Sequence, residues 1–256
     1  MFDIGVNLDQ PSYLEDLDQF RKDYMESGVQ GIVCIASHLD EAKSILELCV
    51  PYEDMYVTLG CHPHHAKTWS PTHYSELVAL FHSNKNAIAV GETGLDFNRN
   101  YSTPEEQINA FEQQLLLAKE VAKPLYLHER DATEIMLKML NNANLDYGGV
   151  IHCFTGDTET MKKYLDLGLF VGITGWLLDE RRNQSLQAAV KELPLDRLLL
   201  ETDAPYLTPR NIRPRPKRNH PKYLPWIAEE IARIKELDVN EIIDAANQNT
   251  KRLFLR

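Results

Sequence analysis

The sequence is poor in the features that mark membrane and secreted proteins. No run of 18 apolar residues occurs among its 256 residues, so no transmembrane helix is expected. The opening stretch, MFDIGVNLDQ, lacks the basic start and the apolar core of a secretory signal. The chain has only 4 cysteines and no CxxC pair, which argues against a disulfide framework or a zinc knuckle. We therefore expect a cytoplasmic protein with reduced thiols.

Positive charge is also scarce, with 27 Lys and Arg against 38 Asp and Glu and a formal net charge of −11. Bulk electrostatics would repel nucleic acid and anionic membrane, so an anionic partner needs a local basic patch. One exists between Ala204 and Ala228, where no acid occurs and six basic residues do: Arg210, Arg213, Arg215, Lys217, Arg218 and Lys222. This segment is either a guide for a polyanion, an ordinary solvated proline-rich loop, or an arm docked on the protein's own acidic surface.

Short β-rich runs alternate with amphipathic helical segments along the chain. The predicted strands are Phe2–Val6, Gly31–Ile35, Tyr56–Leu59, Ile88–Val90, Leu125–Leu127, Gly149–Ile151, Leu169–Ile173 and Leu198–Leu200. The predicted helices are 14–27, 39–49, 72–83, 104–122, 131–140, 158–167, 180–192 and 222–235, followed by two closing helices at about 239–246 and 249–254.

Eight such pairs in a chain of this length indicate an α/β protein, a (β/α)8 TIM barrel, as a single domain over residues 1–256. The competing architecture is a doubly wound open sheet. That fold usually has a glycine-rich first turn, and GVNLDQ is not one.

Polar residues with metal-binding or catalytic chemistry follow most of the predicted strands. In a barrel these positions share one rim. A histidine or acid at any one of them is most simply a hydrogen-bonded or helix-capping group. Four together are harder to explain so, because two carboxylates brought close are costly unless a cation neutralises them. We infer a divalent metal site, suited to Mg²⁺, Mn²⁺ or Zn²⁺, formed by Glu92, His128, His152 and Asp203.

Several long motifs resemble one known family. GCHPHH, VGETGLDFNRNYSTPEEQ, LHERDA, IHCFTG, GITGWLLDERR and LLLETDAPYLTPR resemble, in this order, the TatD family of metal-dependent deoxyribonucleases, within the amidohydrolase-type barrels. The resemblance runs from Phe2 to about Phe254. It implies a magnesium-dependent exonuclease that works 3′ to 5′ on single-stranded DNA or RNA, and metal ligation by Glu92, His128, His152 and Asp203.

One position departs from the family pattern. Many relatives have a His-x-His pair on the first strand that binds a second metal, and this sequence has Gly5-Val6-Asn7 there. Glycine offers no side-chain ligand, and an amide oxygen is a weak one. We therefore expect one firmly bound metal and a second that binds weakly, if at all.

The remaining site residues are given roles by their chemistry. With Glu92 on the metal, Asp203 is expected to take a proton from the attacking water or orient it. Glu201 lies on the same face of its strand as Asp203, so it either orients a metal ligand or pairs with a loop cation. Asn7 is also expected to orient a metal ligand.

Further side chains are candidates for binding phosphate. His62 and His64 flank Pro63 in a rigid turn and can donate to a phosphate oxygen or serve the structure alone. Arg130 can bind a phosphate or clamp a rim carboxylate, and Arg210 and Arg213 belong to the basic segment. Trp176 and Tyr206 are candidates for stacking on a base or for packing, and Arg181 and Arg182 are expected in salt bridges.

Three functions are compatible with such a barrel. A nuclease acting on single-stranded nucleic acid needs the basic segment, whereas a hydrolase of a small neutral amide, lactone or phosphotriester does not. Relatives of the neutral-substrate kind also usually have a lysine on the fourth strand, where this chain has Glu92. A non-catalytic barrel that binds a protein partner would not require the metal-ligand set. We expect a nuclease that is monomeric and has no membrane partner.

Overall fold

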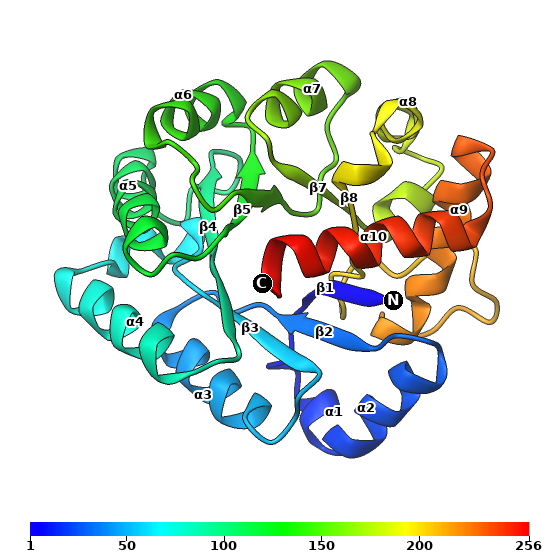
Figure 1. Cartoon of the computed structure of the whole chain (residues 1–256), viewed down its shortest axis with the longest axis horizontal. Coiled ribbons are helices and arrows are strands. Elements are labelled where there is room, and N and C mark those ends of the chain that lie inside the picture. Colours follow the sequence, from blue (N-terminus) through cyan, green and yellow to red (C-terminus); the bar gives the residue numbers. More distant parts are fainter. Residues whose placement is uncertain (256) are drawn as a thin grey trace. The chain divides into compact units, whose positions relative to one another are not determined.

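The computed structural model describes residues 1–255. Its eight strands form one sheet with neighbours in chain order, β1 to β8 (Figure 1). A parallel bridge joins Val6, at the end of β1, to Ala204, which follows β8. Consecutive parallel pairing with intervening helices confirms the predicted (β/α)8 class. The strands are β1 Phe2–Val6, β2 Gly31–Cys34, β3 Met55–Leu59, β4 Ala87–Asp96, β5 Leu125–Arg130, β6 Gly149–Ile151, β7 Phe170–Ile173 and β8 Leu198–Leu200.

Helices connect successive strands, and two more follow β8. They are α1 Pro11–Leu14, α2 Leu17–Glu26, α3 Leu39–Cys49, α4 Pro71–Ser83, α5 Pro104–Glu120, α6 Thr133–Ala143, α7 Thr158–Asp166, α8 Gln184–Glu192, α9 Leu224–Lys235 and α10 Val239–Phe254. Short 3-10 helices are η1 Pro63–Thr68, η2 Gly175–Leu178, η3 Leu195–Arg197 and η4 Pro221–Tyr223. No helix among the described residues combines the length and the apolar character needed to cross a membrane.

The chain divides into two compact units, which we describe separately. The first unit consists of residues 1–34, 152–165 and 170–252. In it β7 pairs with β8, and β1 pairs with β2. All three leucines of β8 are at most 1% exposed. A parallel strand covered on both faces is apolar throughout, which explains the uninterrupted Leu198–Leu200 run.

The second unit consists of residues 35–151 and 166–169, with the described residues from Leu253 on. Its strands pair in the order β3–β4–β5–β6. Helix α5 packs on β4 and begins in a capping box, in which Thr103 accepts from the N–H of Glu106 and Glu106 accepts from that of Thr103. Such reciprocal capping fixes the first turn of the helix and, with it, the loop that joins β4 to α5.

Several predicted bounds were wrong, and three of the differences have an identifiable local cause. β4 extends to Asp96 instead of ending at Val90, because its GETG stretch pairs with β5. The extension was missed because this glycine-containing stretch has little β-propensity. The predicted helix 14–27 begins later, at Leu17, since the Asp16 side chain accepts from the Gln19 N–H and caps α2, and the short helix α1 precedes it. The two closing helices are one, α10, because its sequence contains neither proline nor glycine to interrupt it.

Candidate metal centre

The pairing of β4 with β5 places three polar side chains together in the second unit. Gly94 is opposite His128, and Asp96 is opposite Arg130. Because side chains alternate along a strand, Glu92, Gly94 and Asp96 share a face, so His128 lies between the two acids. Glycine is required at position 94, since a Cβ there would lie 2.0 Å from the carbonyl oxygen of His128.

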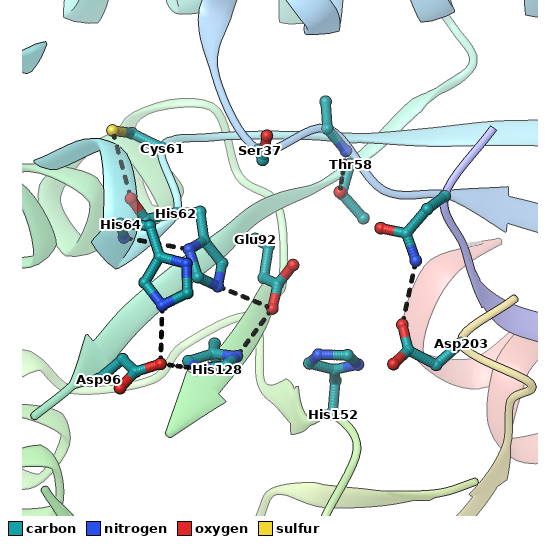
Figure 2. Close-up of polar contacts among 12 residues, drawn as sticks. Ser37, Thr58, Cys61, His62, His64, Glu92, Asp96, His128, His152 and Asp203 are labelled. Carbon is teal, nitrogen blue, oxygen red and sulfur yellow. Dashed lines mark hydrogen bonds and ion pairs between the residues drawn. The ribbon is translucent and has the colours of Figure 1, made fainter. Parts of the chain in front are cut away.

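The resulting contacts form one connected group, which we call the acid–imidazole cluster: His62, His64, Glu92, Asp96 and His128 (Figure 2). Glu92 Oε1 lies 2.9 Å from His128 Nδ1 and 3.4 Å from His62 Nε2. Asp96 Oδ2 lies 2.8 Å from His64 Nε2 and 3.4 Å from His128 Nε2. Two carboxylates thus face three imidazole rings within a region that is largely shielded from solvent.

Two buried glutamines of α5 hold the strand ends that carry the cluster. Gln107 accepts from the N–H of Asp96 and donates to its carbonyl oxygen. Gln114 does the same at Cys61, directly before His62. Both side chains are completely buried, so their amides satisfy backbone groups that would otherwise be stranded away from water. The cluster therefore stands on a rigid base.

The protonation of His62 follows from its surroundings. Burial lowers the pKa of His62 to about 4, although Glu92 acts in the opposite direction, so the ring is neutral at pH 7. Its Nδ1 accepts from the N–H of His64 at 3.1 Å, as the cap of η1. The proton of the neutral ring is therefore on Nε2, which makes His62 a donor toward Glu92.

Hydrogen bonds hold Asp96 in its charged form. Burial alone would raise the pKa of Asp96, but hydrogen bonds from His128, from the Arg99 N–H and from His64 outweigh it and bring the pKa below its ordinary value. A permanent negative charge thus lies beside His128. It favours a fixed ring orientation and strengthens the ring as a ligand, as carboxylates do at metal-binding histidines.

The donor chemistry of the cluster fits a divalent cation. His62, Glu92 and His128 each offer one ligand atom, and these three atoms lie within 4.8 Å of one another. A carboxylate and an imidazole together suit Mn²⁺, Zn²⁺ or Fe²⁺, and Mg²⁺ where water completes an oxygen-rich shell. The Nδ1 contact of His62 favours Glu92 and His128 as the ligands of this group, with His62 beside them as an N–H donor.

The first unit contains a second acid–imidazole pair. His152 Nδ1 lies 3.1 Å from Glu201 Oε2, and Glu201 Oε1 accepts from the N–H of Cys153 at 2.5 Å. Glu201 has no exposed surface. Gly172 leaves the room for it, because a Cβ at that position would be 2.4 Å from Glu201 Oε1. Glu201 therefore fixes the ring of His152 rather than facing solvent.

Asp203 is oriented by the first strand. Asn7 Nδ2 donates to Asp203 Oδ1 at 3.0 Å and to the Ala204 carbonyl oxygen at 3.2 Å. Asp203 has a φ of 55°, a conformation that aspartate tolerates better than most residues. The position at which many relatives have a metal-binding histidine thus carries an amide that positions a carboxylate.

The two remaining rim candidates differ in how they are held. His64 is fixed by Asp96 and is partly exposed. Arg130 is exposed, and within residues 1–255 it has no carboxylate at ion-pair distance. The suggested clamp on a rim carboxylate is therefore not formed, which leaves the guanidinium available to a ligand.

Arginines line an open cavity of about 880 Å³ in the first unit. Arg213 donates to the carbonyl oxygens of Arg210 and Ile212 and, among the described residues, pairs with no carboxylate. Lys222 is different, because it pairs with Asp23 at 2.7 Å. The five arginines of the cavity wall are Arg181, Arg210, Arg213, Arg215 and Arg233.

Asp179 neutralises part of this charge. It pairs with Arg181 at 2.6 Å and with Arg182 at 2.9 Å, the salt-bridged arrangement that the sequence favoured for these two arginines, and it lies 3.7 Å from Arg210. Arg182 also covers the ring of Trp176 at 3.5 Å from the centroid, so that face of the indole is already occupied.

Two features near the metal candidates were not predicted from the sequence. Asp96 was expected on the rim beside Glu92 but was given no role, yet it contacts both His64 and His128. The spacing Glu92-x-Gly94-x-Asp96 was the available signal, since it puts both acids on one face of a strand. Tyr101, in the loop after β4, contacts His64 and could not be found from spacing.

Comparison with known proteins places the chain in one family. The family described as TatD related DNase matches residues 2–255. The chain is 43% identical to the 3′-5′ ssDNA/RNA exonuclease TatD of Edwardsiella piscicida, over 99% of each chain. It is 42% identical to the protein of the same name from Klebsiella pneumoniae, over 99% of this chain and 97% of that one.

Solved structures agree with this placement. The chain is similar to YJJV, a TatD homologue from Escherichia coli, with a TM-score of 0.93 and 27% identity over 100% of this chain and 98% of that one. A mutant organophosphorus hydrolase from Deinococcus radiodurans has a TM-score of 0.66 at 16% identity, covering 99% and 91% of the two chains. At that identity the likeness shows the fold alone.

Proposed function

Because the chain belongs to the TatD related DNase family, we propose that it is a metal-dependent 3′-5′ exonuclease of single-stranded DNA and RNA. One observation of the structure carries the proposal. The Glu92 carboxylate lies between the rings of His62 and His128 on adjoining elements, and Asp96 holds His128 from its other side. This is a preorganised group of ligand and hydrogen-bonding atoms of the kind that phosphodiester hydrolysis needs.

We propose Glu92, His128, His152 and Asp203 as metal ligands. In the second unit, the support is the contact of His128 with both Glu92 and Asp96. In the first unit, the support is that Glu201 fixes the ring of His152 and Asn7 fixes Asp203. Ligands held in this way by neighbouring groups are typical of metal centres, because the metal requires a defined geometry.

A bound divalent ion supplies a Lewis acid for a phosphate oxygen and lowers the pKa of a water molecule. The other tasks belong to the protein. Asp203, which Asn7 orients, is suited to accept a proton from the attacking water. His62 carries its proton on Nε2 and can donate it in a hydrogen bond to a non-bridging phosphate oxygen. His64, which Asp96 holds in place, lies beside His62 at the edge of the acid–imidazole cluster.

We propose that the arginine-lined cavity binds phosphates of the nucleic acid, with Arg210 and Arg213 as the first candidates. Arg130, in the second unit, is a further candidate for phosphate binding. The support is local charge: the cavity wall and its neighbour Arg182 contribute six guanidinium groups against the three carboxylates of Asp179, Glu180 and Glu230. On an acidic chain such a concentration attracts a polyanion.

The native ion stays a prediction, with Mg²⁺ expected from the family resemblance. The imidazole ligand favours Mn²⁺ or Zn²⁺ at equal concentration, so abundance rather than affinity would select Mg²⁺. The test is to strip the protein of metal and incubate it with 5′-labelled single strands of DNA or RNA, adding Mg²⁺, Mn²⁺ or Zn²⁺ separately. A ladder that shortens one nucleotide at a time from the 3′ end is expected. Activity equal without metal, or internal cuts only, would contradict the proposal.

A further inference from the structure

An exposed aromatic ring adjoins the acid–imidazole cluster. Tyr101 follows β4 and is 58% exposed. Its ring centre lies 4.8 Å from that of His64, with the two planes at 90°. The His64 ring lies 4.3 Å from that of His62, whose Nε2 contacts Glu92. Tyr101 therefore offers an open apolar surface one ring away from the group proposed to bind the scissile phosphate.

The backbone that presents Tyr101 is held on both sides. Before it, Asp96 Oδ1 accepts from the N–H groups of Asn98 and Arg99. After it, the buried Ser102 donates to the His64 carbonyl oxygen and accepts from the N–H of Lys67. The ring thus projects from an ordered loop, which reduces the entropy lost when a ligand rests on it.

Exposure alone would not single out this residue, because isolated exposed aromatics are common on soluble proteins. Tyr147 provides the comparison within the same unit. It is 44% exposed and lies in the turn that precedes β6, at the amino-terminal end of that strand. Tyr101 follows the carboxyl-terminal end of β4 and contacts the cluster. Position, and not exposure, distinguishes the two.

We propose that Tyr101 is the surface on which a base of the single strand stacks when its phosphodiester lies at the acid–imidazole cluster; this inference rests on the proposed nuclease function. Every base has a π-face, so stacking on tyrosine binds a strand without reading its sequence. Such a contact suits an enzyme that removes successive nucleotides of any kind. It requires the ring of Tyr101 and not its hydroxyl group.

The test combines a change in the enzyme with a change in the substrate. Metal-loaded wild type and Tyr101→Ala are each assayed on two 5′-labelled oligonucleotides. The first is an ordinary single strand, and the second lacks the bases of its two 3′-terminal nucleotides. On the ordinary strand, Tyr101→Ala is expected to lower kcat/KM roughly 5- to 150-fold, the measured range for removal of one stacking surface. On the strand without terminal bases, the two enzymes are expected to cleave at the same reduced rate.

Two further variants complete the design. Tyr101→Phe keeps the ring and is expected to retain the wild-type rate on both substrates, and Tyr147→Ala is the matched control. Equal losses by Tyr101→Ala on both substrates, no loss on either, or a Tyr101→Phe variant as slow as Tyr101→Ala would each overturn the stacking role. A wild type that cleaves neither strand would instead remove the nuclease function and the stacking proposal with it.

Discussion

The two acid–imidazole pairs use the same contact for different ends. In both, the Nδ1 atom of a histidine meets a glutamate oxygen, at 2.9 Å for His128 and Glu92 and at 3.1 Å for His152 and Glu201. Glu201 is fully buried and also accepts from the Cys153 N–H, whereas the Glu92 side chain is 10% exposed and meets a second imidazole. In our proposal the enclosed Glu201 orients His152, whereas the more accessible Glu92 binds the metal.

The largest difference between the pairs is expected on loss of charge at Glu92. Glu92→Gln keeps the shape of the side chain but removes the anionic oxygen that contacts two imidazoles. We expect kcat to fall by about 10³-fold or more, because one metal-centred interaction supplies several kcal/mol. Exonuclease assays measure the loss, and thermal unfolding verifies that the variant folds.

Glu112→Gln is the control for this change, since Glu112 is an exposed carboxylate on α5 of the same unit. Asp203→Asn is expected to cause a loss of similar size, because asparagine tolerates the left-handed φ but accepts no proton from water. Wild-type turnover in Glu92→Gln would show that Glu92 does not bind the metal and would contradict the different roles proposed for Glu92 and Glu201.

A smaller loss is expected from a change in the buried pair of His152 and Glu201. Glu201 uses one oxygen for His152 and the other for the Cys153 N–H, and glutamine has only one acceptor oxygen. Glu201→Gln should therefore loosen the His152 ring and lower metal affinity by about 10- to 100-fold, the range for removal of a group that orients a ligand. Calorimetric titration with Mn²⁺ measures it. A loss as large as that of Glu92→Gln would mean that the two carboxylates have the same role.

The arginine-lined cavity lies outside both pairs and should affect binding without affecting chemistry. We expect Arg213→Glu combined with Arg215→Glu to weaken binding of single-stranded DNA and to reduce the slope of log affinity against log salt by roughly one unit for each phosphate that is no longer neutralised. Fluorescence anisotropy at several salt concentrations measures the slope. Lys222→Glu is a control at a cation already paired with Asp23. An unchanged slope would show that the arginine-lined cavity does not bind the nucleic acid.

The last prediction concerns stability and a buried acid close to the pair of His152 and Glu201. Burial raises the pKa of Asp3 to about 8, against hydrogen bonds from Thr202 and Gly5 and with a contribution from Glu201. The folded state therefore holds a proton between about pH 4 and pH 8 that the unfolded chain has released. Stability should fall as pH rises through this window, by up to about 1.4 kcal/mol per pH unit.

Asp3→Asn removes this titration and keeps the same hydrogen-bonding partners: the amide oxygen can accept from the N–H groups of Thr202 and Gly5, and the amide nitrogen can donate to the Thr202 hydroxyl, which reverses the direction of that one bond. Denaturant unfolding at pH 5, 6, 7 and 8 should show a flatter profile for this variant. Parallel profiles for the two proteins would show that Asp3 is charged in the folded state throughout.

The sequence predicted most of the fold, because its signals were local. β1, β6, β8 and α3 have the expected bounds, since each is an apolar or amphipathic run bounded by caps and turns. The extension of β4 could not be predicted, because pairing with β5 overrides the low strand preference of its glycines. α10 was divided in the prediction at a point where Asn249 in fact donates to the carbonyl oxygens of Leu195 and Leu198.

The site was predictable only in part, for the same reason. Residue types at strand ends identified Glu92 and His128, which the structure brings together. The tautomer of His62 depends on a backbone N–H two residues further on, and the role of Asp96 depends on the register between two strands. The exposure of Tyr101 and its contact with His64 follow from how a loop folds back, which no spacing in the sequence records.

The most direct test of the account is binding of Mn²⁺ to the metal-stripped protein, followed by electron paramagnetic resonance for wild type, Glu92→Gln and Glu112→Gln. We predict that wild type and Glu112→Gln bind one ion tightly, and that Glu92→Gln loses this binding while remaining folded. Equal binding by all three proteins would show that the Glu92 carboxylate is not a ligand and would contradict the assignment of the metal centre.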